Sequence, residues 1–464
     1  MRTSATPRSI EGMTLMEINA GDTAWVLVSA ALVLLMTPGL AFFYGGMVRV
    51  KSTLNMMMMS AITIAVVTVL WVVVGYSLTF GGDTGRVIGD FSTVGLKGLL
   101  AEDAVSGTIP TLAFVAFQLM FAIITPALIS GAIADRATFR GWIVFVALWT
   151  TLVYFPVAHS VWFLDGDNPG GFIGTGIKAI DFAGGTAVHV NAGAAALALA
   201  IVLGKRIGWR KDPMRPHSLP LVVLGAGLLW FGWFGFNAGS ALSAGATAAI
   251  TFVNTQAATA AAVIGWLIVE RIRHGKATTL GMASGAVAGL VAITPACGAV
   301  TPLGALILGL VAGGICAFAV SLKYKLGFDD SLDVVGVHLV GGLVGSLGIG
   351  FLGTAAAPSA VDGLFYGGGV DQLGRQALAN LIVGVYSFVV AFILAKLIDL
   401  TIGFRVKEDD EVIGVDQVEH AETAYDFLGA SGLRGHGPAI RTTAPAEVEE
   451  ASSEEPTKKE GANA

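Results

Sequence analysis

The sequence is poor in charge. Asp, Glu, Lys and Arg make up 13% of its 464 residues, whereas soluble domains carry about a quarter. Hydrophobic residues account for 54% of the chain. This balance excludes an ordinary soluble domain and indicates an integral membrane protein. We expect the lipid bilayer as a partner of such a protein, and we expect no nucleic acid partner.

The residues that enzymes and metal sites need are also scarce. The two cysteines, Cys297 and Cys316, lie in or beside apolar runs, which indicates neither a disulfide framework nor a metal cluster. The chain has no phosphate-cradling loop, no credible serine or cysteine triad and no metal-ligand spacing. We therefore expect no enzyme, no cofactor and no bound metal. We also expect no cleaved signal peptide, because no short apolar core with a cleavage site precedes the first apolar run.

Long apolar runs, in contrast, recur along nearly the whole chain. A helix of about 20 apolar residues crosses a hydrocarbon core of roughly 30 Å. The 62 glycines and other small residues favour a tightly packed helical bundle. We predict an all-α integral membrane protein with eleven transmembrane helices at residues 23–46, 53–80, 108–133, 141–163, 182–204, 217–239, 247–271, 278–297, 302–322, 332–353 and 376–403.

Basic residues alternate between the loops in a way that predicts orientation. They gather in the loops that follow the odd-numbered spans, whereas the other loops are poor in them. Because cytoplasmic loops carry the excess of Lys and Arg, the N-terminus is predicted outside and the C-terminus in the cytoplasm, in the cell inner (plasma) membrane. The basic loop residues are Arg49, Lys51, Arg136, Arg140, Lys205, Arg206, Arg210, Lys211, Arg215, Arg271, Arg273, Lys276, Lys323 and Lys325.

Two similar segments indicate an internal repeat. DFAGGTAVH ends at His189 and DSLDVVGVH ends at His338, and each places an aspartate eight residues before its histidine. The segments begin the fifth and the tenth span, so five spans separate them. An odd number of spans per repeat makes the halves inverted in the membrane. We predict a pseudo-two-fold inverted repeat of five helices, spans 1–5 and 6–10, followed by an eleventh helix.

The repeat predicts that the two histidines lie at similar depth. Each sits six or seven residues inside its span, or about 10 Å at 1.5 Å per residue, and the two spans enter from opposite faces. One interpretation is that each imidazole is a buried packing residue. Because ionisable groups inside a membrane are costly and usually face a pathway, we favour a functional pair.

Aromatic residues near the predicted outer face have two interpretations. Trp233 and Phe236 precede Ser240 at the end of the sixth span, while Phe121 and Trp162 belong to the third and fourth spans. Such rings are common at membrane interfaces and in packed cores. Alternatively, their faces line a cavity that attracts a cation, with the Ser240 hydroxyl as an acceptor.

Taken together in order, these segments resemble the Amt/Mep/Rh ammonium transporter family, in particular its bacterial Amt branch. The resemblance runs from about residue 20 to residue 427. It rests on TPGLAFFYGG (37–46), FQLMFAIITPALISGA (117–132), AHSVWF (158–163), DFAGGTAVHVNAG (181–193), GWFGFNAGSA (232–241), ITPACG (293–298), DDSLDVVGVHLVGG (329–342) and GFRVKEDDEVIGVDQVEHAETAY (403–425).

The resemblance implies a role for each matching position. Substrate recruitment falls to Trp162, Ser240, Phe121 and Phe236, and Phe121 with Phe236 forms the gate. His189 and His338 match the histidine pair of the pore. Electrostatic or structural support falls to Asp181, Asp333, Trp233, Tyr154 and Thr294.

The same resemblance implies a homotrimer in which each subunit has its own pore for ammonium and methylammonium. We expect the cation to lose its proton near the gate, so that ammonia crosses an apolar pore while the histidine pair relays the proton. Histidine suits this role because its ordinary pKa, about 6.5, leaves both forms accessible. Alternatives are a passive ammonia gas channel, a membrane ammonium sensor and a sodium-coupled carrier.

The C-terminal part differs from the rest in charge. From Arg405 onward it holds six Lys and Arg against fourteen Asp and Glu. We divide the chain into an extracellular N-terminal segment (1–22), a membrane domain (23–404), an ordered cytoplasmic regulatory tail (405–428) and a disordered acidic tail (429–464). By resemblance, the ordered tail communicates with a trimeric PII-type signal protein at the cytoplasmic face; the alternative is that the acidic tail is merely solubilising.

Overall fold

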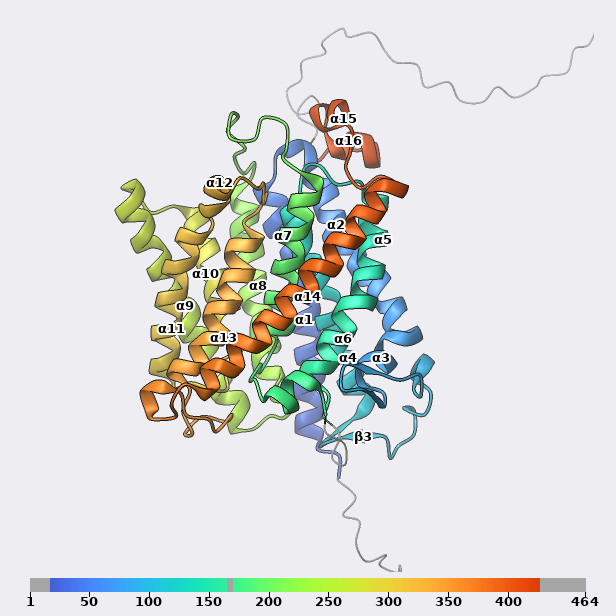
Figure 1. The fold of residues 1–464 in the computed structure, drawn as a ribbon, viewed down its shortest axis with the longest axis vertical. Coiled ribbons are helices and arrows are strands. Elements are labelled where there is room, and N and C mark those ends of the chain that lie inside the picture. Colours follow the sequence, from blue (N-terminus) through green and yellow to red (C-terminus); the bar gives the residue numbers. More distant parts are fainter. Residues whose placement is uncertain (1–16, 165–169, 426–464) are drawn as a thin grey trace, which may run out of the picture. The chain divides into compact units, whose positions relative to one another are not determined.

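A computed structural model describes residues 17–164 and 170–425. The predictions for residues 1–16 and 426–464, which include the last three residues of the predicted ordered tail, lie outside this part. Among the described residues, ten helical stretches are long and apolar enough to cross a membrane, and they run side by side in Figure 1. They are Ala20–Met47, Val50–Phe80, Thr111–Ile133, Phe139–Trp162, Gly185–Leu203, Leu219–Gly239, Ala246–His274, Pro302–Leu326, Val335–Leu352 and Asp371–Thr401.

The α-helices account for most of these stretches, and short 3-10 or π turns complete several of them. The α-helices are α1 (Ala20–Met47), α2 (Thr53–Leu70), α3 (Tyr76–Phe80), α4 (Thr111–Ile129), α5 (Phe139–Trp149), α6 (Phe155–Trp162), α7 (Asn191–Leu203), α8 (Leu219–Gly239), α9 (Ala246–His274), α10 (Thr279–Ile293), α11 (Pro302–Ala319), α12 (Leu322–Leu326), α13 (Val340–Leu352), α14 (Asp371–Thr401), α15 (Glu408–Ile413) and α16 (Val415–His420). The short turns are η1 (Val50–Ser52), η2 (Trp71–Gly75), η3 (Val94–Leu96), η4 (Ser130–Ile133), η5 (Thr150–Tyr154), η6 (Phe172–Ile177), η7 (Gly185–Val190), η8 (Val335–Leu339) and η9 (Leu364–Tyr366).

Two small hairpins interrupt the helical fold in the loop between residues 81 and 110. Strand β1 (Asp83–Thr84) pairs antiparallel with β2 (Ile88–Gly89), and β3 (Val105–Ser106) pairs antiparallel with β4 (Ile109–Pro110). They lie at the end of the bundle opposite α15 and α16 (Figure 1). Below, the end that carries α15 and α16 is called the tail end, and the other is called the far end.

The eighth predicted span is shorter than expected. We predicted a helix over 278–297, but α10 has 15 residues and ends at Ile293. Pro295 explains the early end, because a proline has no backbone N–H with which to continue the hydrogen bonds of the helix. The chain then turns through Cys297 and Val300, whose carbonyls both accept hydrogen bonds from the Asn254 amide of α9 at 2.8 Å. The described residues therefore contain ten long apolar helices and one short one.

Polar residues set where several helices begin. A hydroxyl that accepts a hydrogen bond from a backbone N–H in the first turn satisfies a donor that the helix itself leaves unpaired. Thr138, Thr278 and Thr301 do this for α5, α10 and α11, each bonding to the N–H three residues further on. Each of these caps follows a polar or irregular loop and precedes an apolar run, which is why the sequence predicted these starts closely.

Small residues bring α9 and α11 into close contact. A Cβ atom built on Gly309 would lie 2.1 Å from the carbonyl oxygen of Ala258, and one on Gly313 would lie 2.1 Å from that of Ala262. Gly309 and Gly313 are four residues apart and share one face of α11. Because lipid provides no hydrophobic drive between helices, such close backbone packing is a main source of their association.

This contact gives a first prediction. The G313A variant should lower the thermal unfolding midpoint, because the new methyl group forces α9 and α11 apart at a cost of about 1–3 kcal/mol. The adjacent G314A variant is the control, since its Cβ would meet only Val269, at 3.8 Å. Thermal unfolding of the two purified variants in detergent checks this. Equal midpoints would show that the close contact contributes nothing measurable.

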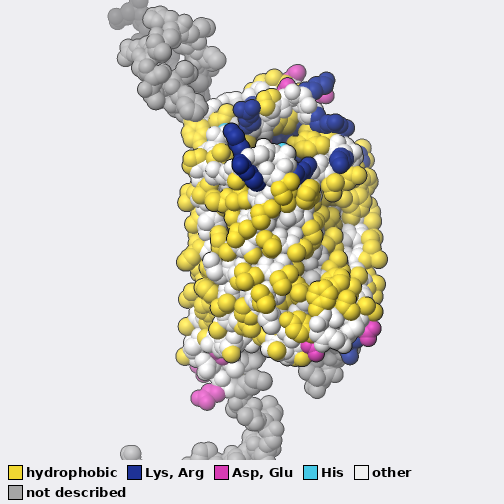
Figure 2. All heavy atoms as spheres, turned by 90° about the vertical axis from the view of Figure 1, so that its left-hand side faces the viewer, with side chains coloured by type: hydrophobic (Ala, Val, Ile, Leu, Met, Phe, Trp, Pro, Cys, Tyr) yellow, Lys and Arg dark blue, Asp and Glu magenta, His cyan; other side chains and the backbone are white. Residues whose placement is uncertain are grey.

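The outer surface agrees with a membrane environment. Figure 2 shows a broad band of hydrophobic side chains on one face, with Lys and Arg gathered at one end of it. Large apolar side chains on several helices are exposed, among them Val69 at 64%, Leu381 at 63% and Leu400 at 79%. Exposed apolar surface of this extent is typical of lipid contact. The chain is a multi-pass, mostly helical membrane protein.

Candidate functional site

The two predicted histidines occupy the same kind of local structure. His189 lies in the π turn η7, which leads directly into α7, and His338 lies in the π turn η8, which leads directly into α13. Both helices therefore begin with a wider turn that ends in an ordinary α-helix. Single π turns are rare and occur frequently at functional sites.

The structure brings the two imidazoles into contact. Nδ1 of His338 lies 3.2 Å from Nδ1 of His189, and the ring centroids are 5.3 Å apart with an angle of 27° between the planes. Both side chains are buried. At this distance one Nδ1 donates a hydrogen to the other, so the pair shares one proton position between the rings. The predicted histidine contact is therefore present in the structure.

Two glycines allow this contact. Gly193 and Gly342 each lie four residues after a histidine. A Cβ atom on Gly193 would lie 2.5 Å from the backbone nitrogen of Leu339, and one on Gly342 would lie 2.9 Å from the carbonyl oxygen of Gly185. The two histidine-bearing helices thus cross backbone to backbone just beyond the histidines, and a larger side chain at either glycine would separate the rings.

Asp181 organises the start of η7. Its carboxylate accepts four backbone hydrogen bonds: Oδ1 from Gly184 and Gly185 at 2.9 and 2.6 Å, and Oδ2 from Thr186 and Ala187, both at 2.9 Å. Burial raises the pKa of Asp181 to about 6, and the four N–H donors oppose that rise. The carboxylate does not reach the histidines; it holds the helix that carries one of them.

Asp330 does the same for the second histidine. Its side chain accepts hydrogen bonds from the N–H groups of Val334 and Val335 at 3.1 and 2.8 Å, at the start of η8. Asp333, which we singled out from the resemblance, instead pairs with Lys323 at 2.6 Å. The residue equivalent to Asp181 is therefore Asp330. The eight-residue spacing to the histidine was the signal for it in the sequence.

Trp162 and Ser240 are the partly exposed residues of the predicted recruitment set. Trp162 ends α6 and donates its Nε1–H to the carbonyl oxygen of Asp181 at 2.9 Å, which fixes the indole beside η7. The Ser240 hydroxyl follows α8 and donates to the carbonyl oxygen of Phe236 at 2.8 Å. Its hydrogen is thereby used, so its lone pairs are available to accept from a ligand.

A run of rings joins this partly exposed position to the histidines. Trp162 meets Phe121 edge to face with centroids 6.0 Å apart, and Phe121 packs on Phe236 at 4.3 Å with the planes 37° apart. Phe236 lies 6.1 Å from the His189 ring, nearly parallel to it. Both phenylalanines are fully buried. The five residues form a continuous line that ends at His338.

The remaining predicted residues lie around this line. Trp233 stacks on His189 with centroids 5.4 Å apart, and its Nε1–H donates to the Thr294 hydroxyl at 2.8 Å. Thr294 thereby holds the indole against the imidazole. Tyr154 is fully buried in η5 and contacts Phe155 rather than the line of rings. The structure thus brings Trp233 and Thr294 to the histidines, but not Tyr154.

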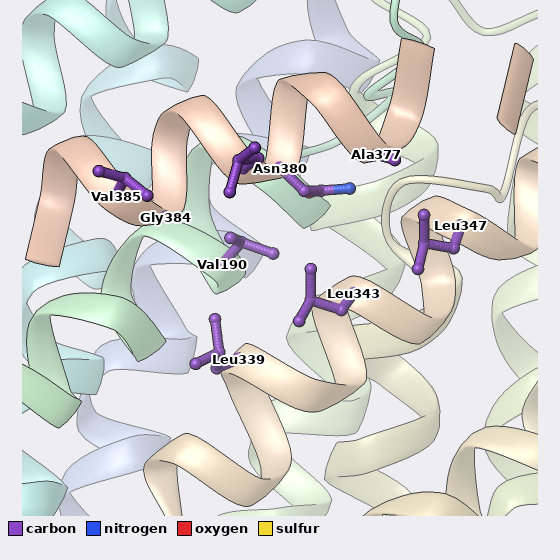
Figure 3. Close-up of a pocket in the computed structure, with 9 residues that line it drawn as sticks. Val190, Leu339, Leu343, Leu347, Ala377, Asn380, Gly384 and Val385 are labelled. Atoms are coloured by element: carbon purple, nitrogen blue, oxygen red, sulfur yellow. The ribbon is translucent and has the colours of Figure 1, made fainter. Parts of the chain in front are cut away.

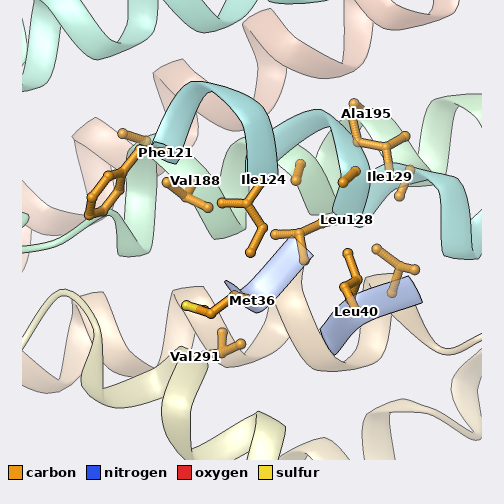
Figure 4. Packing of buried hydrophobic residues seen from close by; sticks show 14 of the residues in the cluster. Met36, Leu40, Phe121, Ile124, Leu128, Ile129, Val188, Ala195 and Val291 are labelled. Carbon is orange, nitrogen blue, oxygen red and sulfur yellow. The ribbon is translucent and has the colours of Figure 1, made fainter. Parts of the chain in front are cut away.

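The interior around the histidines is apolar and narrow. An enclosed cavity there has room for about one molecule the size of water. Apart from the two imidazoles and the Trp233 indole, its lining is apolar: Met36, Leu40, Phe43, Ile124, Leu128, Val188, Leu229, Phe236 and Val287. Figure 4 shows Met36 and Leu40 of α1 facing Ile124 and Leu128 of α4. Apart from Phe236, the sequence did not identify these lining residues, because apolar side chains are everywhere in the chain.

A larger hollow lies on the opposite side of the histidine-bearing helices. It is an open groove of about 360 Å³ between α13 and α14. Figure 3 shows Val190, Leu339 and Leu343 on one side of it and Asn380 and Val385 on the other. Val190 and Leu339 each follow a histidine directly, so the groove backs onto the pair without including it. Its open, leucine-lined form is typical of lipid contact rather than of a polar binding site.

The C-terminal segment contacts the starts of two membrane helices. The Asp416 carboxylate in α16 accepts hydrogen bonds from the N–H groups of Leu54 and Asn55 in the first turn of α2, at 2.9 and 2.8 Å. Glu419 accepts one from the N–H of Phe139 at the start of α5, at 2.9 Å. Helix starts favour negative charge, so both contacts are of a stabilising kind.

Glu411 in α15 adds a third link from this segment. Its carboxylate pairs with Arg405 at 2.9 Å and accepts a hydrogen bond from the N–H of Ile207 at 2.7 Å. Lys51, in turn, donates to the carbonyl oxygens of Glu411 and Val412 at 2.8 and 2.7 Å. The tail is thus bonded to three separate loops at the tail end of the bundle.

The chain is similar to known proteins along most of its length. The family model described as Ammonium Transporter Family matches residues 24–425. An ammonium transporter of Mycobacterium tuberculosis (strain ATCC 25618 / H37Rv) is 60% identical over 438 residues, covering 89% of this chain and 92% of that one. An ammonium transporter of Bacillus subtilis (strain 168) is 46% identical over 410 residues, covering 87% and 98%.

Solved structures show the same fold. The crystal structure of Candida albicans Mep2 has a TM-score of 0.78 and 34% identity, covering 86% of this chain and 89% of that one. A structure described as a sensor Amt protein has a TM-score of 0.79 and 28% identity, covering 86% and 98%. The fold is that of a multi-pass membrane protein, and the relatives named here are transport proteins rather than enzymes. The chain belongs to the Ammonium Transporter Family.

Proposed function

We propose that this protein transports ammonium, by recruiting the cation at Trp162 and Ser240, removing its proton at or below the Phe121 and Phe236 gate, and conducting ammonia past the histidine pair. The observation that carries this proposal is the continuous line from a partly exposed indole and hydroxyl, through two phenylalanines in contact, to two hydrogen-bonded imidazoles in an apolar cavity.

The recruitment end suits a cation. Indole and phenyl faces attract ammonium with about 1–2 kcal/mol each when water is excluded, and the Ser240 hydroxyl offers an acceptor. These contacts replace part of the hydration shell. The apolar cavity beyond the phenylalanines cannot accept the ion, because an unpaired charge in such surroundings is prohibitively costly. Recruitment therefore selects the cation, while passage requires the neutral molecule.

The histidine pair suits a proton relay. One proton lies between the two Nδ1 atoms, and Nε2 of His189 is buried without a hydrogen-bond partner among the described residues. That free nitrogen offers a proton acceptor beyond the pair. A proton that enters on one ring and leaves from the other crosses in the same cycle as the ammonia, but by a separate route. One positive charge therefore crosses per cycle. Potassium has no proton to lose and is excluded by the same step.

Electrical recording tests this proposal against its alternatives. Liposomes that contain the purified protein should give a transient current on addition of ammonium or methylammonium, and none on addition of potassium. Ammonia flux without any current would indicate a passive gas channel. Cation binding without flux would indicate a sensor. This alternative is relevant because one of the similar structures is described as a sensor Amt protein. A current that requires sodium would indicate a coupled carrier.

We further infer eleven spans with an inverted repeat. In this count, the short helix α10 and the turn that follows it form one span, in addition to the ten long helical stretches. Three features recur in the two histidine segments and support the repeat: the aspartate that caps the helix start, the π turn, and the glycine four residues after the histidine. The proposed orientation places the far end outside and the tail end in the cytoplasm of the inner membrane. Protease accessibility of the tail in oriented vesicles tests that orientation.

We also infer a homotrimer whose cytoplasmic tail receives a PII-type signal protein. The tail is bonded to the first turns of α2 and α5 and to the loop before α8, so a partner that displaces α15 or α16 would uncap helices of the bundle. Light scattering of the purified protein tests the trimer. Co-purification with a PII-type protein, lost in a variant truncated after Arg405, tests the partner.

A further inference from the structure

Buried polar side chains connect α14 to both histidine-bearing helices. Gln376 and Asn380 belong to α14, and Ser346 belongs to α13. All three are buried, and none of them lines the apolar cavity beside the imidazoles. Asn380 instead borders the open groove of Figure 3, on the other side of these helices. Because polar groups inside a membrane are costly and usually functional, these contacts call for an explanation.

Asn380 forms hydrogen bonds to both histidine-bearing segments. Its Oδ1 accepts from the Thr186 hydroxyl in η7 at 2.9 Å, and its Nδ2 donates to the Ser346 hydroxyl in α13 at 2.8 Å. Nδ2 also donates to the carbonyl oxygen of Gln376 at 2.8 Å. Both amide hydrogens are therefore used, and one side chain links the two segments directly.

Gln376, one turn earlier on α14, makes a second link of the same kind. Its Oε1 accepts from the N–H of Ile180, and its Nε2 donates to the carbonyl oxygen of Ile180, both at 2.7 Å. Nε2 also donates to the Ser346 hydroxyl at 2.9 Å. The chain that leads into η7 is thus joined to α13 at the same hydroxyl that Asn380 uses.

The Asn380 link lies at the point where the two segments cross. Gly185, whose carbonyl oxygen lies close to Gly342 in the crossing, directly precedes Thr186, and Ser346 lies one turn after Gly342 in α13. The glycines let the backbones approach, but they do not fix the angle between them. Hydrogen bonds are directional, so bonds from one amide to both segments restrict that angle.

The contact between the imidazoles is sensitive to this angle. His189 lies three residues after Thr186, so a rotation at the crossing displaces its ring. The two Nδ1 atoms are 3.2 Å apart, which is at the long end of the range for hydrogen bonds. A further separation of about half an ångström would therefore break the bond between the rings.

We propose that Asn380 is a positioning residue for the histidine pair. It fastens η7 to α13 at their crossing and so keeps the two imidazoles within hydrogen-bond distance, although its own hydrogen bonds go to neither ring. The effect on transport rests on the proposed function, whereas the effect on the histidine contact can be measured by itself. Helix α14, which lies outside the proposed repeat, thereby acts on the contact between its two halves.

Two variants that remove the link test the proposal. T186V deletes the hydroxyl donor with little change in shape, and N380L replaces the amide with an apolar group. Nitrogen-15 NMR is recorded on the full chain, labelled on its seven histidines and reconstituted in liposomes, with H338A identifying the signals of the pair. The Nδ1 signals of His189 and His338 should lose their hydrogen-bond shifts in T186V and N380L. T186S keeps the hydroxyl and should retain the wild-type spectrum.

The ammonium current of the same variants measures the consequence for transport. The maximal current of T186V and N380L should fall roughly tenfold or more, because a misplacement of about 1 Å can cost about 100-fold in rate. The half-saturating ammonium concentration should stay close to that of the wild type, since Trp162 and Ser240 keep their own hydrogen bonds. A general loss of structure would not separate these two quantities.

S387A is the matched control on the same helix. The Ser387 hydroxyl donates to the carbonyl oxygen of Asn191 at 2.8 Å, and this bond does not involve α13. S387A should therefore keep the histidine signals and most of the current. Size-exclusion chromatography selects folded protein, and T186V decides the test if N380L does not fold.

The NMR signals decide the positioning role, and the current decides the proposed function. Wild-type Nδ1 signals in the folded variants would overturn the proposal, whatever their currents. The absence of a hydrogen-bond shift in the wild type would overturn it as well. Altered signals with a wild-type current would support Asn380 as a positioning residue and would contradict the proton relay.

Discussion

The H338A variant should carry less than about one hundredth of the wild-type ammonium current, since a positioned proton-transfer group contributes about 10²- to 10⁴-fold. Alanine removes one of the two imidazoles and leaves Nδ1 of His189 without its partner at 3.2 Å. The proton then has no acceptor on the tail side of His189 in an otherwise apolar cavity. Solid-supported-membrane recording on liposomes, normalised to the amount of reconstituted protein, measures this loss.

L339A is the matched control for this variant. Leu339 follows His338 directly but lines the open groove on the other side of the helix. This variant should therefore keep most of the current. If H338A kept the wild-type current and still excluded potassium, the histidine pair would have no part in the mechanism. A potassium current through H338A would have a different meaning: water would fill the space of the missing ring, and the pair would act chiefly to keep the pathway dry.

The D181A variant should fail to give folded protein. The Asp181 carboxylate satisfies four N–H groups at the start of η7, and alanine leaves all four buried without partners. An unsatisfied buried donor costs about 1–3 kcal/mol, so four of them approach or exceed the 5–15 kcal/mol that holds a typical domain folded. Yield of monodisperse protein on size-exclusion chromatography and its thermal midpoint measure the effect.

Two comparisons sharpen this second prediction. D330A removes a cap with two N–H bonds rather than four, so it should be destabilised less than D181A. D181N keeps one acceptor oxygen and should lie between wild type and D181A. A D181A protein as stable as wild type would mean that water replaces the carboxylate at all four donors. Transport by such a protein would then report whether the negative charge itself assists recruitment.

Much of the fold could be predicted because the bilayer constrains it strongly. A helix must satisfy its backbone internally and must reach across the hydrocarbon, so the apolar runs located the long helices to within a few residues. The failure at α10 has a local cause. Pro295 ends the helix inside a run that remains apolar, and hydrophobicity alone does not register that change. The side-chain contacts of Asn254 that support the turn join residues distant in sequence.

The site could be predicted in part for a related reason. An imidazole in an apolar span stands out, and two of them at equal distances from an aspartate indicated a pair, which the structure shows at hydrogen-bond distance. The carboxylate that supports the helix of His338 was harder to predict, because Asp330 and Asp333 are neighbours in one short segment. Only the backbone shows that Asp330 caps the helix, while Asp333 faces Lys323. The tail contacts of Asp416 and Glu419 were not predictable, since they depend on where the tail folds back.

The π turns that contain His189 and His338 allow the direction of each imidazole and the packing of each helix to be set independently. An ordinary α-helix would couple the two. In an α-helix, the face that packs against a neighbour fixes the direction of every other side chain on the same helix. A turn with an extra residue changes the angle between the histidine side chain and the packing face of the helix. The helix after the turn then continues with ordinary α-helical geometry. Each imidazole can therefore be aimed at the other while Gly193 and Gly342, one turn further on, keep the two backbones in contact. Deleting one residue from either turn would rotate that ring by about 100° relative to the helix that follows, so the aim of each ring depends on the length of its turn as well as on its chemistry.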